Sequence, residues 1–542
     1  MRHTIKSTKA MGYSDIFLDF LAEKDSARKF YPTASIYDAA AQLRQQSFNR
    51  EAVADILERQ NSALGATQAT LDNIALLRDN DQTVCVFTGQ QAVLLGGPLL
   101  VIFKALGAIK AARLYSKQLR RPVIPVFWIA GDDHDFQEVD HTWLLDRQSE
   151  PVRVAYDSPP ELELPTANIR FSDTEQLKAV KARVRETLGE TDFTDDLYNL
   201  VDRAYSSGDN FVSAFGKMMT DLLGEHGLVL FSPADPEVKR LARPFYRQIV
   251  ELQEAIRRCL NRTNDEIEEA GYHLQVEKSD DAAHLFCNCD GRRPVKRLDG
   301  QFVVGDKTVG KPELLDRIES EPELFSTDVM TRPVLQSWLF PVVSQKGGPA
   351  EIAYLAQNHR LFELFDRTPP VYMARPGATI IEPHIARIVH RYHIDYRELT
   401  GDIEQVVNRV LAATFPANLE KGFERLREDI EYHLNQFTDE ALQFDPSLKK
   451  YTKQTLGKID YLVKGFEGKV FSSHKRMSND TRDRIYRVYN ALYTCRGLQE
   501  RSLNILTFLS KYGRDFLIWL YRELEGEDQN HQLLDMSDYQ SQ

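Results

Sequence analysis

Residues 83–136 read TVCVFTGQQAVLLGGPLLVIFKALGAIKAARLYSKQLRRPVIPVFWIAGDDHDF, and this stretch decides the expected fold. An apolar run at 84–87 leads into a glycine-bearing loop, an apolar helix from about 99 to 116 and a second apolar run at 123–130. Continuously apolar strands are typical of a parallel sheet covered on both faces, and a strand–helix–strand crossover is nearly always right-handed. The stretch therefore predicts an α/β fold built on a parallel sheet.

Polar residues follow both strands of this unit. Parallel strands end at the same carboxyl edge of a sheet, where α/β folds bind their ligands. Residues 88–91 follow the first strand and residues 131–135 follow the second, so we expect the two clusters to form one site. The candidate site residues of this stretch are Thr88, Gly89, Gln90, Gln91, Gly97, Pro98, Lys104, Trp128, Gly131, Asp133, His134 and Asp135.

The first cluster has the composition of an anion-binding loop. Pro98 suits the first position of a helix, and the preceding glycines let the backbone approach a ligand. Free amides at such a helix start bind phosphate or carboxylate. The loop has neither the lysine of a Walker motif nor the G-x-G-x-x-G spacing of a dinucleotide site. A tight turn without a ligand, and a solvated Lys104, are the alternative interpretation.

The second cluster places three carboxylates and an imidazole within four residues, 132–135. Such groups are costly at the end of a buried strand unless they are solvated, bound to metal or catalytic. The alternative is a solvated acidic loop that begins a helix. A third group follows the apolar run 339–343: Gly348 precedes a helix, and Glu351 and Tyr354 lie three residues apart on one face of it.

Composition sets the outer limits. A chain of 542 residues exceeds one hydrophobic core, so several domains are expected. The net charge of −12 argues against broad nucleic-acid binding. The N-terminal residues lack an apolar signal core, and no window reaches transmembrane length, so no membrane partner is expected. Five scattered cysteines do not make a disulfide framework and suit a reducing cytoplasm.

Changes of pattern divide the chain into six segments. The expected segments are 1–150, N-terminal helices and the first part of the core; 151–210, a first connecting insertion; 211–270, more core; 271–330, an antiparallel β insertion; 331–384, the last part of the core; and 385–542, a helical coiled-coil domain. Apolar runs at 227–232, 339–343 and 371–374 are the further core strands.

Apolar residues step by three and four along the last segment. They are Phe423, Leu426, Ile430, Leu434 and Phe437, then Leu456, Ile459, Val463, Phe466 and Val470, then Ile485, Val488, Leu492 and Cys495. These are coiled-coil or helical-hairpin seams, and a homodimer through them is the default expectation. Lys475-Arg-Met-Ser-Asn479 shares letters with the KMSKS signature of class I synthetases but is interpreted as a solvated turn.

Cys287, Cys289 and nearby His284 raise the possibility of zinc. On an alternating strand the two cysteines share one face, but no fourth ligand lies at zinc-finger spacing. We therefore expect small buried thiols, no zinc, and a modest stability cost when both are changed to serine.

Three motifs, taken together, point to a family. They are Thr88-Gly-Gln-Gln91 with Gly97-Pro98 and Lys104, then Trp128-Ile-Ala-Gly-Asp-Asp-His-Asp135, then Gly348-Pro-Ala-Glu-Ile-Ala-Tyr354. Each motif is weak alone, but in this order and spacing they resemble the BshC family, the cysteine-adding enzyme (cysteine ligase) of bacillithiol biosynthesis. The likeness covers essentially the whole chain. It implies a Rossmann-like core related to class I synthetases and nucleotidylyl transferases, two connecting insertions and a C-terminal coiled coil.

The resemblance also implies a reaction, in which cysteine is joined to the amine of glucosaminyl-malate. Because a carboxylate and an ammonium do not condense in water, ATP with Mg²⁺ is the expected activator. Residues 88–91 and Gly97, with Lys104, would hold phosphate; Asp133 and Asp135 would carry Mg²⁺ or the cysteine ammonium; His134 would be acid, base or donor.

Two departures and two alternatives accompany this hypothesis. The HIGH motif of synthetases is replaced by Gly96-Gly97-Pro98 and the Phe103-Lys104 turn, and the zinc cysteines that select cysteine in cysteinyl-tRNA synthetases have no counterpart. A class I-like amide ligase or nucleotidyl transferase acting on another amino acid is one alternative. A coiled-coil scaffold with a degenerate nucleotide site is the other.

Overall fold

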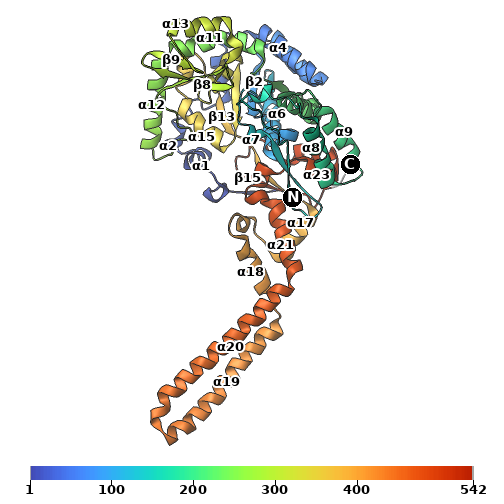
Figure 1. Ribbon diagram of the computed structural model, residues 1–542, viewed down its shortest axis with the longest axis vertical. Coiled ribbons are helices and arrows are strands. Elements are labelled where there is room, and N and C mark those ends of the chain that lie inside the picture. Colours follow the sequence, from blue (N-terminus) through green and yellow to red (C-terminus); the bar gives the residue numbers. More distant parts are fainter. Residues whose placement is uncertain (1, 540–542) are drawn as a thin grey trace. The chain divides into compact units, whose positions relative to one another are not determined.

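The computed structural model describes residues 2–539, which form two compact units. Unit 1 is Met1–Glu382 together with Thr494–Gln542, and unit 2 is Pro383–Tyr493 (Figure 1). The expected helical domain at 385–542 therefore spans unit 2 and part of unit 1. Its last part returns to unit 1, because a strand near the C-terminus pairs there with two others.

The core of unit 1 is a five-stranded sheet in the order β13-β12-β2-β3-β6, parallel throughout. Its strands are β2 (Val84–Gln90), β3 (Val123–Ile129), β6 (Val229–Phe231), β12 (Val342–Gly347) and β13 (Val371–Ala374). The α/β fold and four of the five predicted strand positions are confirmed. The run predicted at 339–343 shares only residues 342 and 343 with β12, because residue 339 still belongs to the preceding helix. From β2 the chain builds outward on one side through β3 and on the other through β12. The β2–β12 junction is thus the topological switch point, where such sheets open a ligand crevice.

Helices cover both faces of this sheet. The helices of unit 1 are α1 (Asp15–Leu21), α2 (Asp25–Arg28), α3 (Ile36–Leu43), α4 (Arg50–Ala63), α5 (Gln68–Asp79), α6 (Leu99–Leu119), α7 (Phe136–Val139), α8 (Thr174–Leu188), α9 (Thr194–Ala204), α10 (Phe211–Leu223), α11 (Pro236–Glu251), α12 (Gln253–Glu269), α13 (Lys311–Ser320), α14 (Arg332–Leu339), α15 (Pro349–Asn358), α16 (Leu361–Leu364), α22 (Gln499–Ser502), α23 (Leu506–Tyr512) and α24 (Asp515–Glu523). The predicted crossover helix is α6, which packs on β2 and β3.

The expected β insertion is also confirmed. A second sheet, antiparallel, has the order β10-β9-β8-β7-β11. Its strands are β7 (Ala282–Asn288), β8 (Arg292–Leu298), β9 (Gln301–Val304), β10 (Lys307–Val309) and β11 (Phe325–Thr327). Asp299 and Gly300, both at positive φ, join β8 to β9 in the two-residue turn that favours hairpins. The region expected as a first insertion contains α8 and α9, preceded by the hairpin of β4 (His141–Leu145) and β5 (Pro151–Ala155).

A third sheet, which was not predicted, joins strands from near the two ends of the described chain. Strand β15 (His531–Asp535) pairs antiparallel with β1 (Arg2–Ile5) and parallel with β14 (Gly377–Ile381). Nearby, buried Glu500 accepts hydrogen bonds from Arg375 Nη2 at 2.6 Å and from the Ala378 amide at 2.7 Å. The C-terminal segment is thus tied to the core by desolvated charges as well as by strand pairing.

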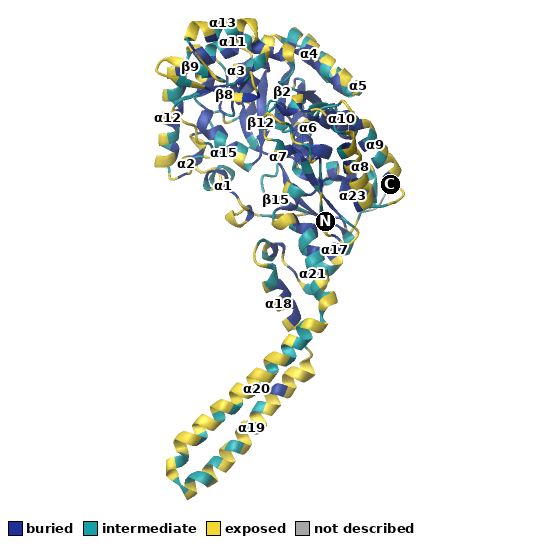
Figure 2. Cartoon of the chain, in the orientation of Figure 1, coloured by how far each residue is buried: buried dark blue, intermediate teal, exposed yellow. Residues whose placement is uncertain are grey.

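Unit 2 is helical, as predicted. Its helices are α17 (Pro383–Tyr392), α18 (Ile403–Ala413), α19 (Ala417–Phe444), α20 (Lys449–Met477) and α21 (Asn479–Leu492). Helices α19 and α20 form a long hairpin around the turn Pro446–Leu448, and both are mostly exposed (Figure 2). Of their side chains, all within the described residues, Phe423 alone is buried. Cys495, the last position of the expected seam, lies in unit 1 instead.

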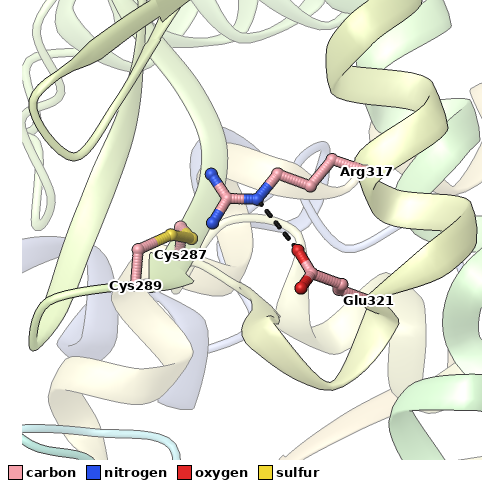
Figure 3. Close-up of a disulfide and its surroundings, with 4 residues drawn as sticks. All are labelled: Cys287, Cys289, Arg317 and Glu321. Atoms are coloured by element: carbon pink, nitrogen blue, oxygen red, sulfur yellow. Dashed lines mark hydrogen bonds and ion pairs between the residues drawn. A yellow bond between two sulfur atoms is a disulfide. The ribbon is translucent and has the colours of Figure 1, made fainter.

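The cysteine prediction needs correction. Cys287 and Cys289 form a disulfide, with Cys287 buried and Cys289 exposed, so they are not two small buried thiols (Figure 3). His284, the third residue of the zinc interpretation, lies with its Nδ1 3.0 Å from the buried carboxylate of Asp328. The other three cysteines are free. In the part of the chain that the structure describes, no helix is long and apolar enough to cross a membrane.

The buried Arg375–Glu500 pair generates a stability prediction. Removing one partner of a buried ion pair leaves the other charge desolvated, which costs about 3–5 kcal/mol. We expect Glu500→Ala to lower the free energy of unfolding by about that amount, measured by urea unfolding. Asp538→Ala, at an exposed carboxylate of the same segment, is the control and should change it by less than about 0.5 kcal/mol. Equal stability of the two variants would contradict the role given to this pair.

Candidate active site

A cavity of about 860 Å³ opens at the carboxyl edge of the central sheet in unit 1. Ten of the predicted site residues line it: Gly89, Gln90, Gln91, Lys104, Trp128, Asp133, His134, Gly348, Glu351 and Tyr354. The polar clusters after β2, β3 and β12 therefore do meet, as the parallel crossover required. Thr88, Gly97, Pro98, Gly131 and Asp135 do not line the cavity.

Lys104 is the buried centre of the site. Helix α6 carries it over the β2–β12 crevice, where Nζ donates to Gly89 O at 2.7 Å, Gln90 Oε1 at 3.0 Å and Glu351 Oε2 at 3.1 Å. Its residue exposure is 6%, so the alternative of a solvated surface lysine is wrong. Burial lowers the pKa of Lys104, and the negative charge of Glu351 opposes that shift.

Glu351 links this lysine to a second cation. It lies in the first turn of α15, which Pro349 opens as predicted, and its Oε1 accepts from Gln345 Nε2 at 2.9 Å and lies 3.5 Å from Arg332 Nη2. Burial acts to raise the pKa of Glu351, but Lys104 and Arg332 outweigh it, so the pKa lies below its ordinary value. The same Arg332 nitrogen donates to Tyr354 Oη at 2.6 Å.

Two carboxylates of the acidic loop after β3, Asp132 and Asp133, have different hydrogen-bond partners. Asp132 accepts two short hydrogen bonds, 2.6 and 2.7 Å, from the buried ammonium of Lys239. Asp133 accepts from Gln91 Nε2 at 2.8 Å, and its side chain is 41% exposed toward the cavity. Both carboxylates line the cavity, but Asp132 is neutralised by Lys239, and Asp133 has the more exposed side chain, 41% against 19%. Asp133 is therefore the carboxylate of this loop that is more open to a ligand.

Arg292, from β8 of the insertion, completes this side of the cavity. Its Nη1 lies 2.9 Å from His134 Nδ1 and 3.8 Å from Asp133 Oδ1, and its guanidinium stacks 3.7 Å from the ring centroid of Phe286. Because a guanidinium only donates, His134 Nδ1 must be the accepting nitrogen. A neutral His134 then carries its proton on Nε2. Burial lowers the pKa of Arg292, and Asp132 and Asp133 act against that.

The glycine turn before α6 is held by hydrogen bonds within the protein. The Gly97 amide donates to Leu94 O at 3.1 Å, and Gly97 O accepts from Asn504 Nδ2 at 2.7 Å. Pro98 forms an isolated β-bridge with the same asparagine. The Gly97 amide, which was expected to be free, is thus hydrogen-bonded within the protein. The C-terminal segment lies against this turn, where an anion was expected to bind.

The other three residues outside the cavity also have local explanations. Thr88 is still inside β2, with its hydroxyl donating to Lys346 O at 3.0 Å. Gly131 lies under the start of α10, because a Cβ there would come within 2.6 Å of Val212. Asp135 is exposed at the start of α7.

Several cavity residues were missed by the sequence analysis. They are Arg292, Arg332, Arg375, Arg501, Lys278 and Asp328. Arg375 directly follows β13, so the rule that located Asp133 at the end of β3 applied equally to it. Arg292 and Arg332 had no such signal, because neither follows a strand of the central sheet.

Comparisons with known proteins agree with this architecture. Residues 1–376 match the family model described as "Bacillithiol biosynthesis BshC, N-terminal Rossmann-like domain". Residues 378–536 match "Bacillithiol biosynthesis BshC, C-terminal coiled-coil domain". The family resemblance and the Rossmann-like and coiled-coil domains are thereby confirmed.

Relatives named "Putative cysteine ligase BshC" align over nearly the full length. The protein of Koribacter versatilis is 33% identical over 508 residues, 93% of this chain and 94% of the relative. That of Salinibacter ruber is 29% identical over 531 residues, 96% of both chains. That of Symbiobacterium thermophilum is 31% identical over 503 residues, 89% of this chain and 88% of the relative. The matches support the enzyme class that the resemblance implied, a ligase, and the chain belongs to the BshC family of bacillithiol biosynthesis.

Proposed function

We propose that this ligase joins cysteine to the amine of glucosaminyl-malate, with ATP and Mg²⁺ activating the cysteine carboxylate. The observation that carries the proposal is the buried Lys104–Glu351–Arg332 network, which faces Asp133 and His134 in one cavity at the switch point of the sheet. The printed names of the relatives and the family supply the cysteine and the pathway.

The energetics of amide formation supports the use of a nucleotide as the activating substrate. Forming an amide from a carboxylate and an ammonium needs an activated acyl group, and ATP would supply that activation when bound. Lys104 and Arg332 are suited to stabilise negative charge that develops on phosphate oxygens, because fixed cations in a desolvated site act without reorganising. Glu351 contacts both and holds them in place.

The carboxylate side fits an ammonium or a magnesium ion. Mg²⁺ is commonly held by one or two carboxylates together with substrate phosphates. Asp133 offers one such carboxylate to the cavity, whereas Asp135, its expected companion, is outside it. Asp133 is thus the residue that would hold Mg²⁺ or, alternatively, the amino group of cysteine.

His134 is best suited to donate a hydrogen bond. Its Nδ1 faces Arg292, which leaves Nε2–H as the free edge of a neutral ring. Of the three roles predicted for His134, this arrangement favours the donor over the general base. The cavity volume lies in the upper part of the range for small-molecule sites, which suits a reaction of several substrates.

The proposal predicts the effect of substitutions on product formation. Purified enzyme with cysteine, glucosaminyl-malate and ATP should form bacillithiol, detected by mass spectrometry. Asp133→Asn and His134→Ala should lower the rate by about 100-fold or more, because each removes a positioned charge or proton donor. Both side chains are partly exposed, so thermal stability should barely change.

Asp135→Asn is the matched comparison, since its carboxylate is two residues away and outside the cavity. It should retain the native rate. Full activity of the first two variants would contradict the site assignment. Product formation from a different amino acid would favour the alternative ligase, and a chain that binds no substrate would favour the scaffold.

We also propose that the enzyme works in the cytoplasm as a homodimer formed through α19 and α20. Large apolar side chains remain exposed along this hairpin: Leu419, Leu426, Tyr432, Phe437, Phe444, Tyr451, Tyr461, Leu462 and Phe466. Apolar patches of this kind mark interaction surfaces, and a second copy presents the same surface.

The dimer has its own test. Phe437 is 67% exposed, so Phe437→Glu should leave the hairpin folded and convert the dimer to a monomer in sedimentation equilibrium. Asn435→Glu adds the same charge at an exposed polar position nearby and should remain dimeric. A monomeric native chain would contradict the proposal.

A further inference from the structure

The Cys287–Cys289 disulfide lies at the end of β7, where the chain turns toward β8. Its two Cα atoms are 5.5 Å apart, and its two halves differ in access: Cys287 is fully buried and Cys289 is exposed. Only the Cys289 sulfur is therefore placed for attack by a molecule from solution. The disulfide is therefore a candidate for reaction with a thiol, in addition to its role as a cross-link.

The disulfide is joined to the cavity through the backbone. Phe286 directly precedes Cys287 and lines the cavity, and Arg292 is three residues after Cys289. Asn288, which the disulfide encloses, pairs across the hairpin with Arg292. Any change of the ring at 287–289 therefore acts on the strand end that carries the Arg292 guanidinium to His134.

We propose that Cys287–Cys289 is a thiol–disulfide exchange site for low-molecular-weight thiols, and that its oxidised form holds Arg292 against His134. In the reduced form the segment 287–289, which leads into the turn before Arg292, loses its covalent restraint. Arg292 then samples positions away from His134, and the side of the cavity that contains His134 becomes less ordered.

The chemistry balances with a thiol as the only reagent. A thiolate attacks Cys289 Sγ, a mixed disulfide forms there, the Cys287–Cys289 bond breaks, and Cys287 leaves as a thiolate. A second thiolate attacks the outer sulfur of the mixed disulfide, which releases Cys289 as a thiolate and forms the disulfide of the reagent. Each cysteine thiolate then takes one proton from water. The electrons that reduce the protein disulfide come from the two reagent thiols.

A cation is positioned to assist the first step. The Arg317 guanidinium is directed toward the sulfur pair, and Glu321 accepts from its Nε at 3.3 Å (Figure 3). A guanidinium close to a sulfur favours its thiolate and so makes that sulfur a better leaving group.

The consequence for catalysis rests on the proposed function. The proposed product is itself a low-molecular-weight thiol, so accumulation of reduced product would reduce the disulfide and slow its own synthesis. The protein disulfide would re-form by the reverse exchange, in which the disulfide form of the same thiol accepts the two electrons. The site would therefore be oxidised when reduced product is scarce, which is when new thiol is needed.

The exchange is tested without any enzyme assay. In a Cys259→Ser, Cys495→Ser background, air-equilibrated full-length protein is titrated with 2-mercaptoethanol, alkylated with iodoacetamide and analysed by peptide mass spectrometry. We expect protection of Cys287 and Cys289 at first, then joint labelling as the thiol rises. With oxidised 2-mercaptoethanol, the Cys287→Ser variant should trap a mixed disulfide at Cys289, and Cys289→Ser should trap about ten-fold less at Cys287. Full initial labelling of both cysteines, or equal trapping, would overturn the proposal.

The link to Arg292 is tested by amide hydrogen exchange over residues 284–298. Reduction should speed exchange there in the background protein, and Cys289→Ser, at the exposed position, should exchange fast regardless of thiol. Reduction should also lower kcat/KM by about ten-fold, the effect of losing one hydrogen bond to a charged group. Unchanged exchange over 284–298 would overturn this inference even if the ligase is active. A chain without ligase activity whose disulfide still exchanges would overturn only the proposed function.

Discussion

A desolvated ammonium at the β2–β12 junction is the constraint on which the site depends. Lys104 has left water almost completely, and such a charge is tolerated only with a partner and further hydrogen bonds. Glu351 supplies the partner from the far side of the switch point, and Gly89 O and Gln90 supply the bonds from the near side. Strands β2 and β12 must therefore keep one register, and the Thr88 hydroxyl bond to Lys346 O spans the same junction.

The C-terminal segment keeps this junction in place from outside the sheet. Asn504 binds the turn that starts α6, the helix carrying Lys104, through both Leu95 O and Gly97 O. Glu500 holds Arg375 at the cavity, and the fully buried Lys346 of β12 donates to Gly526 O. Residues 494–539 therefore belong to the unit that contains the candidate site, although a helical domain separates them from the rest of that unit in sequence.

The two sides of the cavity differ in how rigidly their residues are held. Lys104, Glu351 and Arg332 lie on helices packed against the central sheet, where close packing and mutual ion pairs fix them. Asp133 and His134 lie on a loop, and their ordering comes from Gln91 and from Arg292 of a peripheral hairpin. The first side suits charge stabilisation, which benefits from rigidity, and the second is where a change in the insertion can alter the site.

The sequence by itself determined the parallel sheet, four of its five strands and the beginning of the fifth, the crossover helix, the β insertion and the helical hairpin. Each of these elements can be predicted from the local spacing of its apolar residues, because burying one face of a helix or strand requires that spacing within the segment itself. The shared edge of β2, β3 and β12 then followed from chain topology, and ten site residues with it. Only the tertiary structure decided the β1–β15 pairing, the Asn504 contact with the glycine turn, the approach of Arg292 to His134 and the Cys287–Cys289 bond. The first three join residues more than 150 positions apart, and the bond depends on a turn geometry that the β insertion imposes, so no local pattern encodes them. They form because a folded chain must pair its buried polar groups with whatever partner the packing brings near.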